Sequence, residues 1–336
     1  MLFGLSGIFG SVDTKGRYYY SRLANGQRAI YRTLLSGLES FAGEIRLPLK
    51  PVNEISLIFD CILLDNPLIY YLSSFNHSND LHKNTLLIKP NYKYARSFVK
   101  QNTSIINKYL RVYDAVKNKS DVDKEIFVHD YCLNNFCYDN AYHDYSYSVL
   151  GLVLNRTAVC EGIAKFVKLS LDYLDVSSLV VFGKAKNPVN DDTAERHAWN
   201  IVEIEGMTYH LDVTFDMTLK SKLNRYDYFN LSDDDIKREH TISNGVPLCS
   251  TKGNDYFSVN SLVVFNPVEL DKFIEHSLMH GKKNIMVKLK NVKDTANVVD
   301  KVISIAQQQY ANIYKCTAMV EVKYNPSQLV FEINYL

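Results

Sequence analysis

The sequence predicts an α+β protein in which a helix packs on an antiparallel sheet, with a helical region before this core and a small α/β sandwich after it. Apolar residues recur at steps of three and four over 163–174, which is typical of a helix with one buried stripe. Two alternating segments, 197–204 and 207–213, are separated by Glu205-Gly206, a pair suited to a two-residue hairpin turn. From residue 261 onward, the pattern becomes β-α-β-α-β-β.

The first part of the chain, residues 1–89, is predicted to be mainly helical. Leucine and isoleucine spacing indicates a helix over 18–40, and a second helix over 55–65 should stop before Asn66-Pro67. An apolar, aromatic run at 68–75 favours a strand. A long helix is expected over 92–117.

The predicted core, residues 90–250, continues with a helix that begins at Ser120. The run Ser120 to Asp123 resembles a capping box, with Asp in place of Glu. His129-Asp130 lies on this helix, and we interpret it as structural because adjacent helical side chains point about 100° apart. A buried strand is expected at 179–182, followed by a surface loop over 184–196.

Cys160 stands at the start of the helix predicted over 163–174. Unpaired backbone N–H groups and the helix dipole in a first turn favour an anion, so a cysteine there ionises more readily than elsewhere. The preceding loop, 138–156, is rich in Tyr, Asp and His and should form one wall of a cleft.

The predicted hairpin brings a histidine and an aspartate together. If Ile204 pairs with Met207, then Asp212 lies opposite Trp199, and Thr214 lies opposite His197. His197 and Asp212 then become diagonal neighbours on one polar face, with side chains starting roughly 7 to 8 Å apart. The other face is apolar except for Asn200. The order Cys, His, Asp suits a thiol nucleophile, a proton-transferring imidazole and an orienting carboxylate.

Residues 129–236 resemble the transglutaminase-like superfamily of papain-like thiol enzymes, in its bacterial branch. The matching stretches are Val159-Cys160-Glu161-Gly162 with Ala164-Lys165, Arg196-His197-Ala198-Trp199-Asn200, the run 209–216, and Tyr228-Phe229-Asn230-Leu231-Ser232. The resemblance implies a catalytic triad of Cys160, His197 and Asp212 that acts on protein or peptide amides through a thioester. Water would make the outcome proteolysis or deamidation, and an amine would make it cross-linking. Ile163 and Arg156 depart from the pattern, where Tyr and Gly are usual.

The remaining site residues are placed by position. The backbone N–H of Cys160 and a side-chain donor would stabilise the oxyanion, and Tyr147 is the candidate for that donor. Glu161, Trp199 and Thr214 are expected to line the substrate cleft.

Two alternatives stay open. The chain could be a catalytically silent binding or scaffold protein with the same fold. A metal site built from Cys160, His197, His210 and Asp212 is a weaker alternative, because no close ligand spacing such as His-x-x-x-His accompanies it. We therefore expect no metal and no cofactor.

Length and charge bound the remaining classes. A chain of 336 residues exceeds one ordinary core, and we predict three domains, 1–89, 90–250 and 251–336. With 38 basic and 37 acidic residues, the net charge of +1 gives no electrostatic basis for binding nucleic acid. The last domain carries no recognisable site. Oligomeric state is not predicted.

Cysteine use and the N-terminus point to the cytoplasm, although delivery by another route stays open. The six cysteines show no regular framework, which fits reduced thiols. The first ten residues are apolar but lack the basic start of a secretion signal. No stretch approaches the roughly 20 apolar residues of a membrane span.

Overall fold

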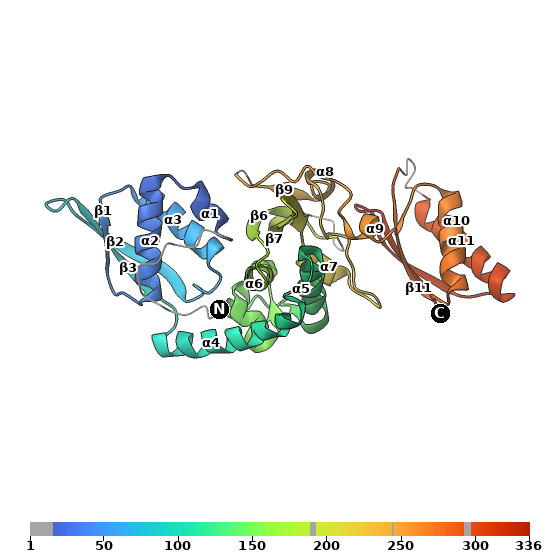
Figure 1. Cartoon of the computed structure of the whole chain (residues 1–336), viewed down its shortest axis with the longest axis horizontal. Coiled ribbons are helices and arrows are strands. Elements are labelled where there is room, and N and C mark those ends of the chain that lie inside the picture. The colour runs from blue at the N-terminus through green and yellow to red at the C-terminus, as the bar shows by residue number, and fades with distance from the viewer. Residues whose placement is uncertain (1–15, 189–192, 244, 292–296) are drawn as a thin grey trace. The chain divides into compact units, whose positions relative to one another are not determined.

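The computed structural model describes residues 16–188, 193–243, 245–291 and 297–336. The chain divides into two compact units. The first unit comprises residues 1–182 and 197–207, and the second comprises 183–196 and 208–336. Figure 1 shows the order of the elements along the chain.

The first unit begins with helices and a sheet. The helices are α1 (Tyr18–Arg22), α2 (Asn25–Glu39) and α3 (Val52–Asp65), and the strands are β1 (Ile45–Pro48), β2 (Leu72–Asp80) and β3 (Thr85–Tyr92) in the order β1-β3-β2. Both strand pairings are antiparallel. Helix α3 ends before Asn66, which confirms the predicted stop. The three-stranded sheet was not predicted, apart from a strand at 68–75 that overlaps β2.

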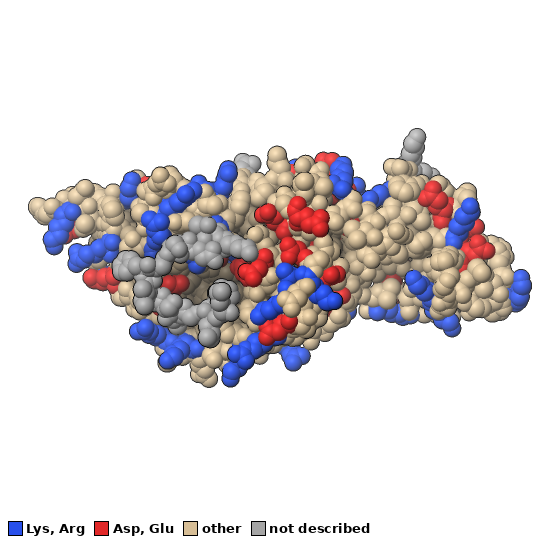
Figure 2. All heavy atoms as spheres, viewed as in Figure 1, with Lys and Arg blue, Asp and Glu red and all other residues tan. Residues whose placement is uncertain are grey.

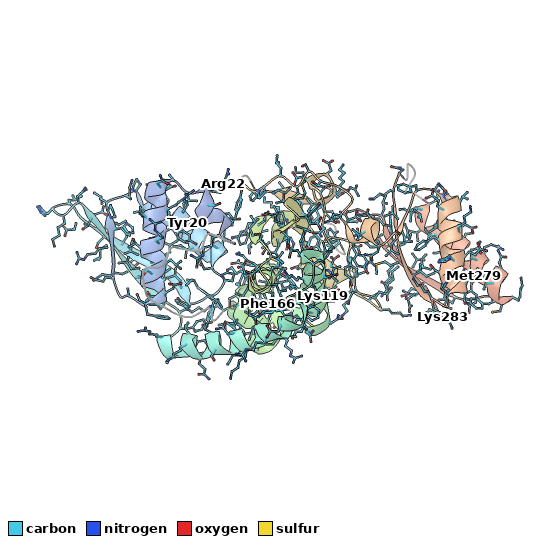
Figure 3. The ribbon with its side chains drawn as sticks, viewed as in Figure 1. Tyr20, Arg22, Lys119, Phe166, Met279 and Lys283 are labelled. Carbon is cyan, nitrogen blue, oxygen red and sulfur yellow. The ribbon has the colours of Figure 1, made fainter. Side chains whose placement is uncertain are left out.

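The single helix predicted over 18–40 is wrong, because the chain turns at Leu23 and Ala24. Ala24 is extended, and its backbone N–H donates to the side chain of Gln27, which restarts the helix as α2. Asp65, at the end of α3, then holds α1 in place. Its carboxylate accepts hydrogen bonds from the backbone N–H groups of Tyr19 and Tyr20, the latter labelled in Figure 3.

A helical layer follows, made of α4 (Arg96–Tyr109), the 3₁₀ turn η1 (Leu110–Val116), α5 (Asp121–Asn135) and α6 (Cys160–Tyr173). The predicted cap of α5 is confirmed, since the hydroxyl of Ser120 accepts from the N–H of Asp123. The predicted helix 92–117 instead starts at Arg96 and narrows to 3₁₀ geometry over its last seven residues. The ring of Phe166 in α6 (Figure 3) lies 5.2 Å from the ring of Phe136, the residue after α5, between centroids. This contact packs α6 against the end of α5.

The segment before α6 contains two short paired strands, β4 (Cys137–Tyr138) and β5 (Thr157–Ala158), with a 3₁₀ turn η2 (Asp144–Tyr147) and a π-helical turn η3 (Gly151–Asn155) between them. Strands β6 (Ser178–Lys186), β7 (Ala194–Ile204) and β8 (Met207–Leu211) follow α6. The loop predicted over 184–196 is therefore shorter than expected, and residues 189–192 lie outside the described residues.

The turn between β7 and β8 is the predicted two-residue turn. Glu205 and Gly206 both have positive φ, 52° and 77°, as a type I′ hairpin turn requires. The second strand is shorter than predicted, because β8 ends at Leu211 and helix α7 (Val213–Leu219) begins immediately. Thr214 therefore lies in a helix, and its predicted place in a strand opposite His197 is wrong.

In the second unit, α7 is followed by α8 (Asp233–Ile236), β9 (His240–Ile242) and α9 (Tyr256–Val259). Strand β9 pairs antiparallel with the end of β6, and His240 lies opposite Ala185. This pairing fixes the position of His240 next to the end of β6.

The C-terminal sandwich has the predicted β-α-β-α-β-β order. Its elements are β10 (Val263–Val264), α10 (Pro267–Met279), β11 (Asn284–Leu289), α11 (Val298–Tyr314), β12 (Val320–Asn325) and β13 (Val330–Tyr335). The sheet order is β10-β11-β13-β12, and only the β10–β11 pair is parallel. Helices α10 and α11 cover one face of the sheet (Figure 1), where Ile285, Val287, Phe331 and Ile333 form the core.

The other face of this sheet is polar and buried. The hydroxyl of Ser221 donates to the carboxylate of Glu332, whose two oxygens lie 2.6 and 2.7 Å from the hydroxyl oxygen. Arg225, which makes a two-pronged ion pair with Asp227, lies 3.6 Å from Glu332. Charged and hydrogen-bonded side chains therefore join the sandwich to the rest of the second unit.

The surface mixes both signs of charge. Figure 2 shows Lys and Arg side chains interspersed with Asp and Glu over the face in view, in keeping with the net charge of +1. Among the helices of the described residues, none combines the length and the hydropathy needed to cross a membrane.

A buried histidine makes the second unit sensitive to acid. The imidazole of His210 on β8 is fully buried, and its Nε2 lies 2.8 Å from the carboxylate of Asp233. Burial lowers the pKa of His210 to about 4, despite the raising effect of Asp233. In the unfolded chain, the same group has a pKa of about 6.5.

We expect the stability contributed by a neutral His210 to be present above pH 6.5 and to be lost as the pH falls toward 4. Between pH 6.5 and pH 4, His210 binds a proton in the unfolded state but stays neutral in the folded state. The free energy of unfolding should therefore fall by about 2 kcal/mol between pH 7 and pH 4.5. The measurement is urea unfolding of wild type and His210→Gln at both pH values. Because Asp172, with a pKa raised by burial to about 6, acts in the opposite direction, only the difference between the two proteins is diagnostic. Equal losses in both proteins would contradict the assignment.

Candidate active site

Cys160 is the first residue of α6, as the sequence predicts. Val159 before it is extended, with φ −84° and ψ 173°, and its N–H donates to the carbonyl of Ser146 at 3.1 Å. The thiol is half-buried. It therefore lies in the first turn of a helix of 14 residues, where backbone N–H groups point outward and the dipole favours negative charge.

Gly162 makes this setting possible. A Cβ atom at Gly162 would collide with the backbone oxygen of Ser146 and would also approach the oxygen of Ser148 at 3.1 Å. Since backbone atoms cannot swing away, no larger residue fits there without moving the loop. The loop thus packs so closely against the first turn of α6 that the second residue after Cys160 must be a glycine.

The loop itself is fixed by a buried aspartate. Asp139 accepts hydrogen bonds from the hydroxyl of Ser146 and from the backbone N–H groups of Ala141 and His143, and these donors hold its pKa well below the usual range. Arg156, which ends the loop, is left-handed with φ 59°. A glycine would adopt this conformation without strain, whereas a residue with a side chain rarely does.

Tyr138 on β4 lies beside Cys160. Its hydroxyl interacts with the backbone N–H of Cys160, and burial together with the nearby Cys160 raises the pKa of Tyr138 above its ordinary value. Tyr147, the donor expected from the sequence, has a side chain that is 42% exposed. The sequence analysis did not single out Tyr138. Strand β4 pairs with β5, which ends just before Cys160, and this pairing brings Tyr138 close to Cys160.

Glu161 follows Cys160 and is half-buried. Its carboxylate forms an ion pair with Lys165 one turn later, at 2.6 Å, and Lys165 also donates to the backbone oxygen of Tyr147 at 3.4 Å. Glu161 therefore helps to hold the loop that carries Tyr147 onto α6. Its expected role in a substrate cleft stays a prediction.

Strand β7 presents two different faces. Ala198 packs in a cluster with Ala164 of α6, and the side-chain amide of Asn200 donates to the backbone oxygen of Ala164 at 2.9 Å. His197 and Trp199 alternate with them, and their rings stack with centroids 5.9 Å apart and 17° between planes. Asn200, which looked out of place on an apolar face, thus ties β7 to α6.

Cys160 and the segment that carries His197 meet in one cluster. The side chain of Cys160 packs against the cluster of Ala164, Val180 and Ala198. Ala198 directly follows His197 in the chain. The first unit therefore brings Cys160 beside the stretch of β7 that carries His197, while Trp199 covers one side of the imidazole ring.

Asp212 caps helix α7 in the second unit. Its side chain is fully buried, and its Oδ1 accepts from the N–H of Phe215 at 3.1 Å. Its Oδ2 lies 3.0 Å from Nε2 of His240. A helix begins here, rather than a continued strand, because this carboxylate supplies the cap. Thr214, one of the expected cleft residues, is buried in the first turn of α7.

His210 lies close to Asp233 and Cys249. The three side chains place one potential ligand atom each within 4.8 Å of one another. His210 and Asp233 already form a direct hydrogen bond, and burial raises the pKa of the Cys249 thiol to about 12. Zinc needs a thiolate, so these residues suit a hydrogen-bonded cluster better than a metal centre. Among the described residues, His210 thus lies with a different set of potential ligands from the set weighed from the sequence.

No protein-family model matches the chain, and no curated protein matches it. Ten chains of solved structures are similar to parts of it, and three of them serve as examples. They are a TGase (16% identity, 51% of this chain and 51% of that chain, TM-score 0.30), a "Putative Cysteine Protease" from Cytophaga hutchinsonii (13%, 42% and 61%, 0.28) and a "putative protease" from Parabacteroides distasonis (13%, 42% and 36%, 0.24). The chain thus spans less than two thirds of each. Similarity at this level places no residue and assigns no activity.

Proposed function

We propose that this protein is a cysteine-dependent acyl-transfer enzyme that acts on protein or peptide amides, with Cys160 as nucleophile, His197 as acid and base, and Asp212 as the orienting carboxylate. The observation that carries the proposal is the position of Cys160. It is a half-buried thiol at the first residue of a long helix, packed against the segment that carries a buried histidine. The motif resemblance supports the same assignment.

The proposed reaction follows from these groups. The Cys160 thiolate attacks the amide carbonyl, and the carbonyl oxygen takes the negative charge, stabilised by the backbone N–H of Cys160. His197 gives a proton to the departing amine, and a thioester to Cys160 remains. Water or a second amine then loses a proton to His197 as it attacks the thioester, which regenerates the thiolate.

The proposal makes one geometric demand. Alternation along β7 directs His197 to the opposite face from Ala198, which contacts α6. The imidazole must therefore reach the thiol around the N-terminal end of α6. A nucleophile in the first residue of the helix meets this demand, whereas one a turn later would be covered by β7.

The second candidate is a binding or scaffold protein without turnover. Its cysteine would be an ordinary half-buried thiol, and Trp199 stacked on His197 would be core packing. The reactivity of Cys160 separates the two candidates.

We expect iodoacetamide at pH 7 to alkylate Cys160 at least about tenfold faster than Cys137 or Cys316, because an ionised thiol is the reactive form. Cys137 and Cys316 are exposed and serve as references within the same molecule, while Cys61, Cys132 and Cys249 are buried with raised pKa values. Peptide mass spectrometry of a time course gives the rate at each cysteine. Cys160 reacting no faster than the two exposed cysteines would favour the scaffold.

The triad variants should separate chemistry from folding. Cys160→Ala should remove acyl-enzyme formation, and His197→Ala should slow alkylation of Cys160. Asp212→Asn should lower turnover by up to about 10⁴-fold, as when a triad's carboxylate is removed. Asn is as good a helix cap as Asp, so α7 should stay folded. Intact-mass spectrometry with glutamine-bearing peptides, with and without an added amine, reads out the thioester and its fate. Wild-type turnover in any of these variants would contradict the assignment.

The oxyanion donor can be identified by a matched pair of substitutions. We expect Tyr138→Phe to lower kcat about tenfold or more, because a lost oxyanion donor weakens only the transition state. Tyr138 is favoured over Tyr147 because it is less exposed and interacts with the N–H of Cys160. Tyr147→Phe is the comparison, and a larger effect there would restore Tyr147 as the donor.

A further inference from the structure

A second histidine holds the aspartate of the proposed triad. His240 lies on β9 (Figure 1), and its side chain is fully buried. Its Nε2 lies 3.0 Å from Oδ2 of Asp212. An ionised carboxylate can only accept, so Nε2 carries the proton in this contact. His240 lies outside residues 129–236, where the motif resemblance was found.

The ring of His240 has little freedom to turn away. Its centroid lies 4.8 Å from that of Phe215 and 6.0 Å from that of Tyr228. Phe215 is also the residue whose N–H is capped by Asp212. The same aromatic residue thus fixes the backbone donor to one carboxylate oxygen and packs on the imidazole that donates to the other.

Side chains of the C-terminal sandwich help to hold Glu239, the residue before His240. Glu239 accepts a hydrogen bond from the hydroxyl of Tyr228 at 2.5 Å and one from the amide of Gln328 at 3.4 Å. Asn325 donates to the same hydroxyl at 3.3 Å. Asn325 and Gln328 belong to the hairpin between β12 and β13, so this hairpin supports the strand that presents His240.

The carboxylate of Asp212 accepts from two donors that come from different elements. These are the backbone N–H of Phe215 in α7 and Nε2 of His240 on β9. Two donors on a buried carboxylate stabilise its charge and fix its plane. An orienting carboxylate in a triad needs both properties when it receives the proton of the catalytic imidazole.

We propose that His240 is a positioning residue of the active site, which holds Asp212 in one orientation and in its charged form. This inference rests on the proposed function, because it gives His240 a role through Asp212. Its effect should appear in the reactivity of Cys160, since an ordered Asp212 stabilises the imidazolium that keeps the thiol ionised.

The test compares two substitutions that differ in one donor. His240→Phe keeps a ring between Phe215 and Tyr228 but removes the donor to Asp212, whereas His240→Gln keeps an N–H donor of similar reach. With iodoacetamide as the probe, we expect His240→Phe to slow Cys160 alkylation by about tenfold or more and His240→Gln to stay within about threefold of wild type. Wild-type reactivity of His240→Phe, or an equal loss in both variants, would overturn the inference. Should His240→Phe not fold, a loss of more than threefold in His240→Gln would overturn it alone.

His210 provides the matched control. It is equally buried, belongs to the same unit and also contacts one carboxylate, that of Asp233. His210→Phe and His210→Gln should leave the alkylation rate of Cys160 unchanged. A loss in His210→Phe as large as that in His240→Phe would mean that the rate reports general loosening, and the role of His240 would fall.

Two further readouts separate this inference from the proposed function. If His197→Ala and Asp212→Asn leave Cys160 alkylation unchanged, the proposed function fails whatever His240 does. If they slow it and His240→Phe does not, only the role of His240 fails. Proton NMR should also show a slowly exchanging Nε2–H signal that His240→Gln removes and Asp212→Asn shifts. An unshifted signal in Asp212→Asn would contradict the contact itself.

Discussion

The close contact between the loop before α6 and the first turn of that helix is the constraint on which the candidate site depends. Because Gly162 has no side chain, the backbone oxygen of Ser146 can approach the helix, and its hydrogen bond to Val159 fixes the residue before Cys160. Asp139 anchors the same loop from within. A thiol at a helix start is common, but a thiol whose flanking backbone is fixed on both sides has a defined direction of attack.

Local patterns predicted much of this arrangement, and contacts distant in sequence account for the rest. The apolar period of α6 and the Glu205-Gly206 turn are properties of short segments, and both are present. The β1-β3-β2 sheet was missed because β2, with Ser, Asn and His along it, has too little apolar alternation to stand out. The end of β8 was misplaced because an aspartate within an apolar alternation was taken as a strand residue, when its side chain caps the next helix.

The candidate site residues show the same division. Cys160, His197 and Asp212 were proposed from motifs and chain order, whereas Tyr138 and His240 entered only with the structure. Tyr138 reaches Cys160 through the pairing of β4 with β5, and His240 reaches Asp212 through the pairing of β9 with β6. Neither pairing has a sequence signal, since β4 and β9 are only two and three residues long. A buried carboxylate predicted at a site is itself a reason to look for a second donor.

The polar inner face of the C-terminal sheet has a consequence for what happens when the sheet separates from its partner. A face lined by Glu332, Asn334 and Lys288 would expose charged and hydrogen-bonding groups to water, whereas an apolar face would favour aggregation. The ion pair between Arg225 and Glu332 crosses this boundary, so it favours one arrangement of the sheet on its partner over others.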